Sequence, residues 1–310
     1  MKLIFCGTPQ FAVPGLEALV RAGHEVELLV TQPDRPRGRG MELALSPVKQ
    51  KAIELALPIV QPEKIKRNEE FRAHLESIAP EAIIVIGYGR LIPDWMLALP
   101  RHGNINLHAS LLPKYRGAAP IQWSIAKGER VTGNSTMRLD AGLDTGDILL
   151  QNEVEIASED TAVTLAPKLA STGADLLLKT LDGLAAGTII PRKQDDAAAT
   201  LAPILSKEDG RVDFSQTAQE INNRLRGFQP WPGAFTSYRG KGLVLHGLLP
   251  LASGTLSPGE LAVDHGKLLV GCGEGTALEL LEVQLEGKRR MSAREFLNGY
   301  QPRPGERLGA

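Results

Sequence analysis

The sequence predicts a two-domain α/β protein in which a doubly wound, mostly parallel sheet is followed by a small β-barrel. At about 150 residues per domain, the chain of 310 residues is long enough for two domains, and 43% of it is hydrophobic. Short apolar runs alternate with helical patterns as far as about residue 190. Beyond that point, short strand-like segments are separated by glycine turns.

The N-terminal residues indicate a strand, a turn and a helix. An apolar run from Lys2 to Cys6 ends at Gly7-Thr8-Pro9. Apolar side chains then recur at helical spacing until Gly23. The run is short and bounded by a turn, as expected for a buried strand.

Further strands and helices follow in alternation. Ser46-Pro47 offers an N-cap with proline at the first helical position, and Asn68 caps a second helix that is expected to end at Ile78. Residues 82–86 are apolar on both faces, which is typical of an inner strand of a parallel sheet. We expect a loop over residues 31–45, helices over 118–127 and 160–186, and strands over 24–30, 103–108, 136–139 and 147–156.

The alternating pattern of strands and helices ends near residue 190, and this change predicts the domain organisation. We expect a catalytic domain over residues 1–189, a linker over 190–207 without a periodic pattern, and a second domain over 208–310. The second domain is predicted to contain a helix over 217–226. Its strands should be separated by turns at Gly240, Gly254, Gly266 and Gly287.

The composition excludes several classes of protein. The apolar runs are far shorter than the roughly 18 residues of a membrane span, and the N-terminal run is too brief for a secretory signal. Cys6 and Cys272 cannot build a disulfide scaffold, so we expect a cytoplasmic protein without membrane contact. The net charge of −1 argues against a uniformly basic surface for nucleic acid, and a local basic patch stays possible.

Two polar side chains at the end of one predicted strand are candidates for chemistry. Asn106 and His108 stand two residues apart, so they should face the same side of the sheet and could reach one ligand. The alternative is equally plausible for an isolated pair, namely that His108 is a hydrogen-bonded core histidine and Asn106 a turn former. No group of Cys, His and carboxylate residues has the spacing of a strong metal site, and we expect no metal.

A tight loop over residues 140–147 carries the candidate carboxylate Asp144. We expect Asp144, like Asn106 and His108, to lie beyond the carboxyl ends of the strands, where open parallel sheets bind ligands. Considered alone, this loop is more often a solvated turn. Asp144-Thr145-Gly146 spells the aspartic-protease triplet, but one copy in an α/β chain argues against that enzyme. The first turn, Gly7-Thr8-Pro9-Gln10, lacks the glycines of a dinucleotide-binding fingerprint, which argues against an NAD-dependent dehydrogenase.

The loop over residues 31–45 carries three arginines spaced two apart: Arg35, Arg37 and Arg39. On a backbone rich in glycine and proline, they could follow the phosphates of a nucleic acid. A plain solvated loop is the commoner case.

These motifs together resemble the 10-formyltetrahydrofolate-dependent formyltransferases. The resemblance rests on Asn106-Leu107-His108, Ser110-Leu111-Leu112-Pro113, residues 116–121 and residues 140–146. The arginine loop, Ser46-Pro47-Val48-Lys49, the opening residues 5–9 and the segment 231–235 are similar to members that formylate initiator methionyl-tRNA. The likeness therefore covers essentially the whole chain.

The resemblance implies a Rossmann-like catalytic domain and an OB-like barrel that helps to hold tRNA, in an enzyme of translation initiation. Apart from the resemblance, we expect a monomer. It implies that Asn106, His108 and Asp144 are catalytic. It also implies that 10-formyltetrahydrofolate is the formyl donor, bound along Ser110, Leu111, Leu112 and Pro113.

The second domain has a balanced charge. Residues 208–310 hold 12 Lys and Arg and 12 Asp and Glu. Its densest basic cluster is expected to contact tRNA phosphates together with the arginine loop: Lys288, Arg289 and Arg290, followed by Arg294. A solvated surface is an equally good interpretation of that cluster.

Formyl transfer is acyl chemistry in which an amine attacks the formyl carbon and an oxyanion develops. We expect Asn106 and His108 to stabilise the oxyanion, and Asp144 to accept the amine proton directly or through water. Two other functions remain open: a family member that formylates a small amine or uses water as acceptor, and a non-enzymatic RNA-binding protein. The arginine loop argues against the first, and the intact Asn106, His108 and Asp144 argue against the second.

Overall fold

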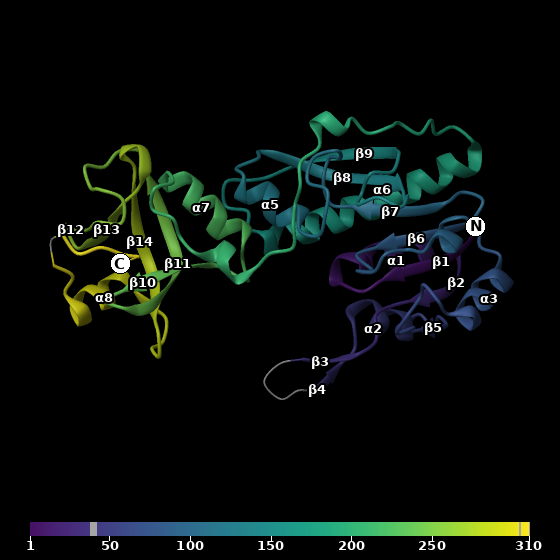
Figure 1. Ribbon diagram of the computed structural model, residues 1–310, viewed down its shortest axis with the longest axis horizontal. Helices are drawn as coiled ribbons and strands as arrows, with labels where there is room; N and C mark the ends of the chain where they lie inside the picture. Colours follow the sequence, from purple (N-terminus) through teal and green to yellow (C-terminus); the bar gives the residue numbers. More distant parts are fainter. Residues whose placement is uncertain (38–41, 304, 310) are drawn as a thin grey trace. The chain divides into compact units, whose positions relative to one another are not determined.

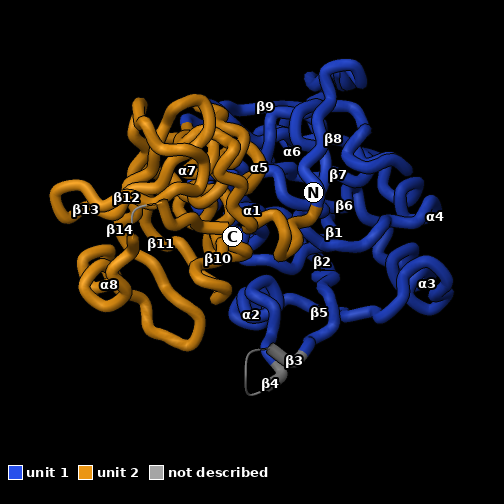
Figure 2. Tube along the Cα trace, turned by 60° about the vertical axis from the view of Figure 1, so that its left-hand side comes forward, with its two compact units in different colours: residues 1–120, 131–155, 166–203 blue, residues 121–130, 156–165, 204–310 orange. Residues whose placement is uncertain are grey.

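The computed structural model describes residues 1–37, 42–303 and 305–309. The chain divides into two compact units (Figure 2), which are described separately. Unit 1 contains residues 1–120, 131–155 and 166–203. Unit 2 contains residues 121–130, 156–165 and 204–310.

Unit 1 is built on one mostly parallel sheet with the order β5-β2-β1-β6-β7-β8-β9 (Figure 1), as predicted. The parallel pairs join β1 (Lys2–Gly7), β2 (Glu25–Val30), β5 (Ile59–Val60), β6 (Ala82–Ile86) and β7 (Asn104–His108). The strand β8 (Val131–Arg138) runs antiparallel to both of its neighbours, β7 and β9 (Ile148–Glu155).

Helices cover both faces of this sheet. Leu3 and Phe5 of β1 face α1 (Val13–Arg21), α2 (Pro47–Glu54) and α6 (Ala162–Ala186). The alternate residues Ile4 and Cys6 face α3 (Glu69–Ile78) and α4 (Asp94–Leu97). Because successive side chains of a strand point to opposite faces, the all-apolar strand serves both layers.

The predicted helix starts at Ser46 and Asn68 are confirmed. The Ser46 hydroxyl accepts a hydrogen bond from the Lys49 backbone N–H at 3.1 Å, and the Asn68 side chain accepts one from Phe71 N–H at 3.0 Å. Each cap satisfies a backbone donor that the first turn of a helix leaves without a partner.

Two predictions about unit 1 need correction. The expected loop over residues 31–45 contains a short hairpin of β3 (Arg35–Arg37) and β4 (Glu42–Ala44). The strand expected over 136–139 begins earlier, at Val131. Its first half is mostly polar, so a search for apolar periodicity misses it. Within this half Asn134 is fully buried, and its side-chain nitrogen donates to Oδ1 of Asn152 at 3.1 Å.

Unit 2 contains an antiparallel sheet with the order β10-β11-β14-β13-β12, and β15 also pairs with β14. Its core gathers side chains of this sheet and of its helices, including Leu225, Leu245, Val283 and Phe296. The predicted turns at Gly240, Gly266 and Gly287 all have positive φ, a conformation that glycine adopts readily.

Unit 2 also contains most of α5, the helix that precedes the other elements of this unit in the sequence. The helix expected over 217–226 is confirmed as α7, and α8 was not predicted. The bounds are α5 (Pro120–Ala126), α7 (Ala218–Gly227), β10 (Ala234–Tyr238), β11 (Lys241–Leu251), β12 (Leu261–Asp264), β13 (Lys267–Gly271), β14 (Ala277–Leu285), β15 (Met291–Ser292) and α8 (Ala293–Tyr300).

Candidate active site

The strand β7 presents Asn106 and His108 from the same face of the sheet. They occupy alternate positions, opposite Met137 and Ser135 of β8. Both are buried, with 8% and 6% of their surfaces exposed. The sequence therefore placed this pair correctly relative to one another.

A backbone carbonyl holds the imidazole of His108. Its Nε2 lies 2.8 Å from the carbonyl oxygen of Tyr115, so this nitrogen carries a proton and donates. The other nitrogen, Nδ1, lies 3.7 Å from Oδ2 of Asp144. That distance exceeds a hydrogen bond but leaves the carboxylate close enough to attract a protonated ring. His108 can donate from Nδ1 only when both ring nitrogens are protonated.

Asp144 is fixed by its backbone and by a neighbouring loop. Its φ of 53° lies in the left-handed region, which is uncommon for residues other than glycine. Its Oδ2 accepts a hydrogen bond from the Gly117 N–H at 2.8 Å. The side chain is 15% exposed, so the carboxylate is mostly shielded from water.

The Asp144 carboxylate lies beside His108, the last residue of β7, although its loop starts at the other end of that strand. Because β8 is antiparallel, the loop that joins it to β9 starts beside the amino end of β7, where Leu139 N–H donates to Asn104. The site is therefore built over one face of β7, between segments that arrive from both of its ends.

The carboxamide of Asn106 is available to a ligand. Among the described residues it makes no hydrogen bond, although its surface is 8% exposed. Buried amides in proteins are normally hydrogen bonded. A free donor beside His108 can therefore bind the oxygen of a substrate.

In the segment 110–113, which is proposed to bind folate, two of the four residues are held by contacts within the protein. Ser110 is fully buried and donates to the Lys114 carbonyl at 2.6 Å. Leu112 is 3% exposed, packs with Met137, and its N–H donates to Ser135 at 3.0 Å. Leu111 and Pro113 are partly exposed, so only these two side chains can contact a ligand here.

The residues expected to contact tRNA phosphates differ in their surroundings. Arg35 is exposed and makes no ion pair within the described part of the chain, whereas the side chain of Arg37 and the whole of Arg39 lie outside it. Arg289 pairs with Glu295 at 2.6 Å, and Arg290 pairs with Glu282. Lys288 follows β14 in the same turn. The two carboxylates partly neutralise this basic cluster.

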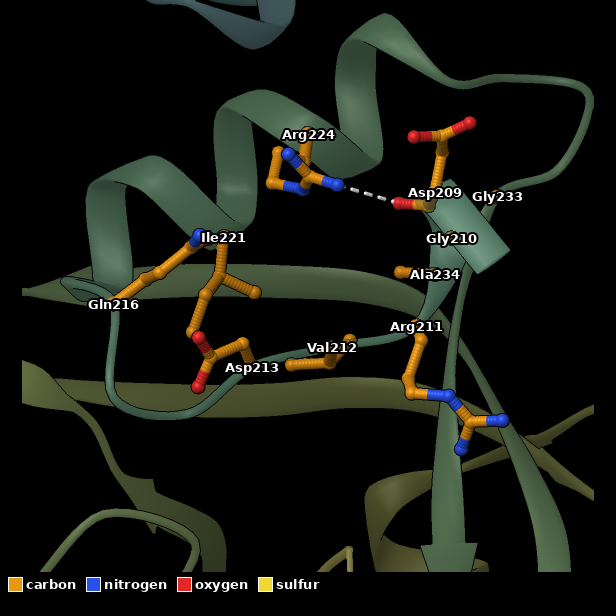
Figure 3. Close-up of a pocket in the computed structure, with 10 residues that line it drawn as sticks. All are labelled: Asp209, Gly210, Arg211, Val212, Asp213, Gln216, Ile221, Arg224, Gly233 and Ala234. Carbon is orange, nitrogen blue, oxygen red and sulfur yellow. Dashed lines mark hydrogen bonds between the residues drawn. The ribbon is translucent and has the colours of Figure 1, made fainter. Parts of the chain in front are cut away.

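A small hollow in unit 2 is distinct from these residues. It is lined by both charged and apolar side chains (Figure 3), and Arg224 crosses it to donate to the Asp209 carbonyl at 2.7 Å. Its charged groups are occupied: Asp213, for example, accepts from the Ser215 hydroxyl and N–H. We assign the hollow no role in the chemistry.

In residues 1–37, 42–303 and 305–309, no group of three or more His, Cys, Asp or Glu side chains could hold a metal ion. Within those ranges no helix combines the length and the apolar character that crossing a bilayer requires.

Sequence reasoning missed the residues that hold the candidate catalytic side chains. Tyr115 and Gly117 act through backbone groups, so their side chains gave no signal for this role. Gln194 donates to the backbone of the Asp144 loop from a segment without any periodic pattern. Such contacts are visible only once the chain is folded.

The sequence is similar to known proteins along nearly all of its length. The formyl transferase family matches residues 1–181, and the C-terminal domain of formyl transferases matches residues 204–301. Methionyl-tRNA formyltransferase of Koribacter versatilis is 65% identical over 309 residues, which is 100% of this chain and 99% of that protein. Methionyl-tRNA formyltransferase of Acidobacterium capsulatum is 63% identical over 311 residues, covering 100% of both chains.

A solved structure supports the fold. An N-formyltransferase of Helicobacter canadensis, solved with folinic acid and dTDP-3-aminofucose, aligns with a TM-score of 0.66 at 18% identity. The alignment covers 90% of this chain and 98% of that one. From the family match and the full-length relatives, we conclude that this chain belongs to the formyl transferase family.

Proposed function

We propose that this protein transfers the formyl group of 10-formyltetrahydrofolate to the α-amino group of methionine on initiator tRNA, for translation initiation. Two relatives of that name match the whole chain at 65% and 63% identity. The observation that carries the chemistry is the 3.7 Å approach of Asp144 to His108, on the strand face that also holds Asn106.

The oxyanion is stabilised by two donors. When the amine attacks the formyl carbon, negative charge develops on the formyl oxygen. The Asn106 carboxamide, which has no partner among the described residues, donates to this oxygen, and the protonated His108 donates from Nδ1. One such donor contributes roughly 10²–10³-fold to the rate in comparable sites.

The proton of the attacking amine passes to Asp144, directly or through water. The bond from the formyl carbon to nitrogen N10 of the folate then breaks, and N10 takes up a proton. The amine therefore gains a formyl group and loses one proton. Proton transfer of this kind contributes typically 10²–10⁴-fold.

No protein nucleophile is required for this reaction. Cys6 is fully buried in β1, and the Ser110 hydroxyl is engaged by the Lys114 carbonyl. Direct attack of the amine on the bound formyl group is therefore the favoured course.

Each substrate is assigned its own surface of the protein. The folate is bound along residues 110–113, with contacts from Leu111 and Pro113. The tRNA phosphates are bound by Arg35, Arg37 and Arg39, and by Lys288, Arg289 and Arg290. We further propose a monomer that acts in the cytoplasm.

In the test, the purified protein is incubated with 10-formyltetrahydrofolate that carries a labelled formyl group. Four reactions contain methionyl initiator tRNA, methionyl elongator tRNA, free methionine, or no acceptor. We expect label on the initiator tRNA, with little on the other acceptors. Transfer to the free amine alone, or release as formate without an acceptor, would refute the proposed acceptor.

A further inference from the structure

The segment over residues 192–202, expected to be part of a linker, is hydrogen bonded to the loops around the candidate active site. The Tyr115 N–H donates to the Thr200 hydroxyl at 2.9 Å, and the Arg116 N–H donates to the Thr200 carbonyl at 2.9 Å. The Ala202 N–H donates to the Arg116 carbonyl at 2.7 Å. Through these bonds the segment supports Tyr115, whose carbonyl holds His108.

Gln194 supports the second loop from the same segment. Its Nε2 lies 2.8 Å from the carbonyl of Asp144 and 2.8 Å from that of Gly146. A carboxamide nitrogen carries two protons, so it can donate to both carbonyls at once. The two bonds hold the backbone on either side of Thr145.

Arg116 fixes the Gln194 side chain in turn. The Nε of this buried arginine donates to Oε1 of Gln194 at 3.0 Å, and its guanidinium also pairs with Asp196 at 2.8 Å. The residue after Arg116 is Gly117, whose N–H binds the Asp144 carboxylate. Gln194 and Gly117 thus hold the backbone and the carboxylate of the same aspartate.

The Asp144 loop needs such support. A left-handed backbone is unfavourable for a residue other than glycine, so neighbouring contacts must maintain it. A close approach adds a further constraint, since a Cβ on Gly146 would lie 1.7 Å from the Arg138 carbonyl oxygen. Losing the Gln194 bonds would therefore let Asp144 shift relative to His108.

We propose that Gln194 is a positioning residue for formyl transfer, which orients the Asp144 carboxylate toward His108 through the backbone of its loop. This inference rests on the proposed function. It places part of the catalytic apparatus in the segment that leads out of the first domain, about 50 residues after Asp144.

The test compares Gln194→Met with the wild type in steady-state formylation of methionyl initiator tRNA. Methionine keeps the length of the side chain and removes both donors. Because misplacement of a catalytic group by about 1 Å can cost about 100-fold, we expect kcat to fall by about 10- to 100-fold. KM for both substrates should stay within about twofold. Lys193→Ala is the control, since Lys193 is exposed and has no partner within the described part of the chain.

A double-variant experiment separates positioning from general weakening of the fold. If Gln194 acts through Asp144, adding Gln194→Met to Asp144→Asn should reduce the single-turnover rate by less than about twofold. An unchanged kcat in Gln194→Met, or an undiminished further loss in the double variant, would overturn the inference.

The experiment also includes a second substitution at position 194, and the activity of the wild type separates failure of this inference from failure of the proposed function. Gln194→Glu keeps an acceptor for Arg116 while removing both donors, so it serves if Gln194→Met does not fold, and it should lose kcat in the same way. An inactive wild type would refute the proposed function itself, whereas an active wild type with unaffected variants would refute only the role of Gln194.

Discussion

The chemistry of the site depends on which His108 nitrogen is free. The Tyr115 carbonyl accepts the hydrogen bond of Nε2–H, so only Nδ1 can serve the reaction. With Asp144 3.7 Å away, the protonated ring is the form that can bind a developing oxyanion. A backbone carbonyl thus determines the role of the side chain.

The two cysteines should be unreactive in the folded protein. Burial raises the pKa of the Cys272 thiol to about 12 and raises the pKa of Cys6 as well. Since the thiolate is the reactive form, titration with a disulfide reagent at pH 8 should modify neither thiol in native protein and both in denaturant. A Leu91→Cys control, at a position that is 83% exposed, should react rapidly. Rapid modification of native wild type would contradict this prediction.

Glu81 should contribute to stability in a pH-dependent way. The Lys2 backbone N–H donates to its carboxylate at 2.8 Å and lowers the pKa of Glu81, with a smaller contribution from Arg101. A group whose pKa is lowered by folding adds stability above its unfolded pKa, and this stability is lost as the pH falls through the folded pKa. Glu81→Gln should therefore reduce the free energy of unfolding at pH 7, and the difference from wild type should shrink near pH 3.

Urea denaturation at the two pH values measures this effect. Glu27→Gln provides a matched control on an exposed strand position without an ion pair in the described residues. A difference between Glu81→Gln and wild type that is equal at both pH values would show that the charge is not responsible.

At the scale of elements, the local signals of the sequence were sufficient for most helices and strands. Ser46 and Asn68 mark helix starts because each cap acts within three residues. Apolar runs mark β1 and β6 because these strands are buried on both faces. Such features need no knowledge of the rest of the chain.

Pairing between distant segments could not be predicted in the same way. The antiparallel direction of β8 is set by its contacts with β7 and β9, and its polar half hides the strand. The same limit applies to the site: Asn106 and His108 follow from strand alternation, but the approach of Asp144 depends on the direction of β8. The contacts of Tyr115 and Gln194 involve backbone atoms that no side-chain pattern marks.

The β3–β4 hairpin carries the arginine that is best placed for a test. Asp34 beside it pairs with Lys49, which leaves Arg35 exposed and without an ion pair in the described residues. If Arg35 binds a phosphate, Arg35→Ala should raise KM for tRNA more than it lowers kcat, and should reduce the slope of log affinity against log salt by about one.

Binding of methionyl initiator tRNA over a range of salt concentrations measures that slope. Arg67→Ala is the control, because Arg67 is also exposed without an ion pair in the described residues. A slope that equals that of wild type would remove Arg35 from the tRNA contacts. The same experiment on Arg39→Ala would test a second arginine of the sequence segment 31–45.

At the scale of the whole molecule, each unit has its own core, and the formyl transferase matches together span most of the chain. The net charge is only −1, and residues 208–310 are balanced in charge. Affinity for tRNA must therefore come from the position of a few cations. The proposed site likewise combines segments far apart in the sequence, from Asn106 to Gln194.

The most direct measurement compares Asp144→Asn with Asp147→Asn in single-turnover formyl transfer to methionyl initiator tRNA. Both changes remove one charge from the same loop, and asparagine at 144 can still accept the Gly117 hydrogen bond. Because Asp144 is assigned the amine proton and the attraction of protonated His108, we expect its variant to lose roughly 10²–10⁴-fold in rate. Asp147→Asn should stay near the wild-type rate. Equal rates for folded Asp144→Asn and wild type would contradict the proposed catalytic group.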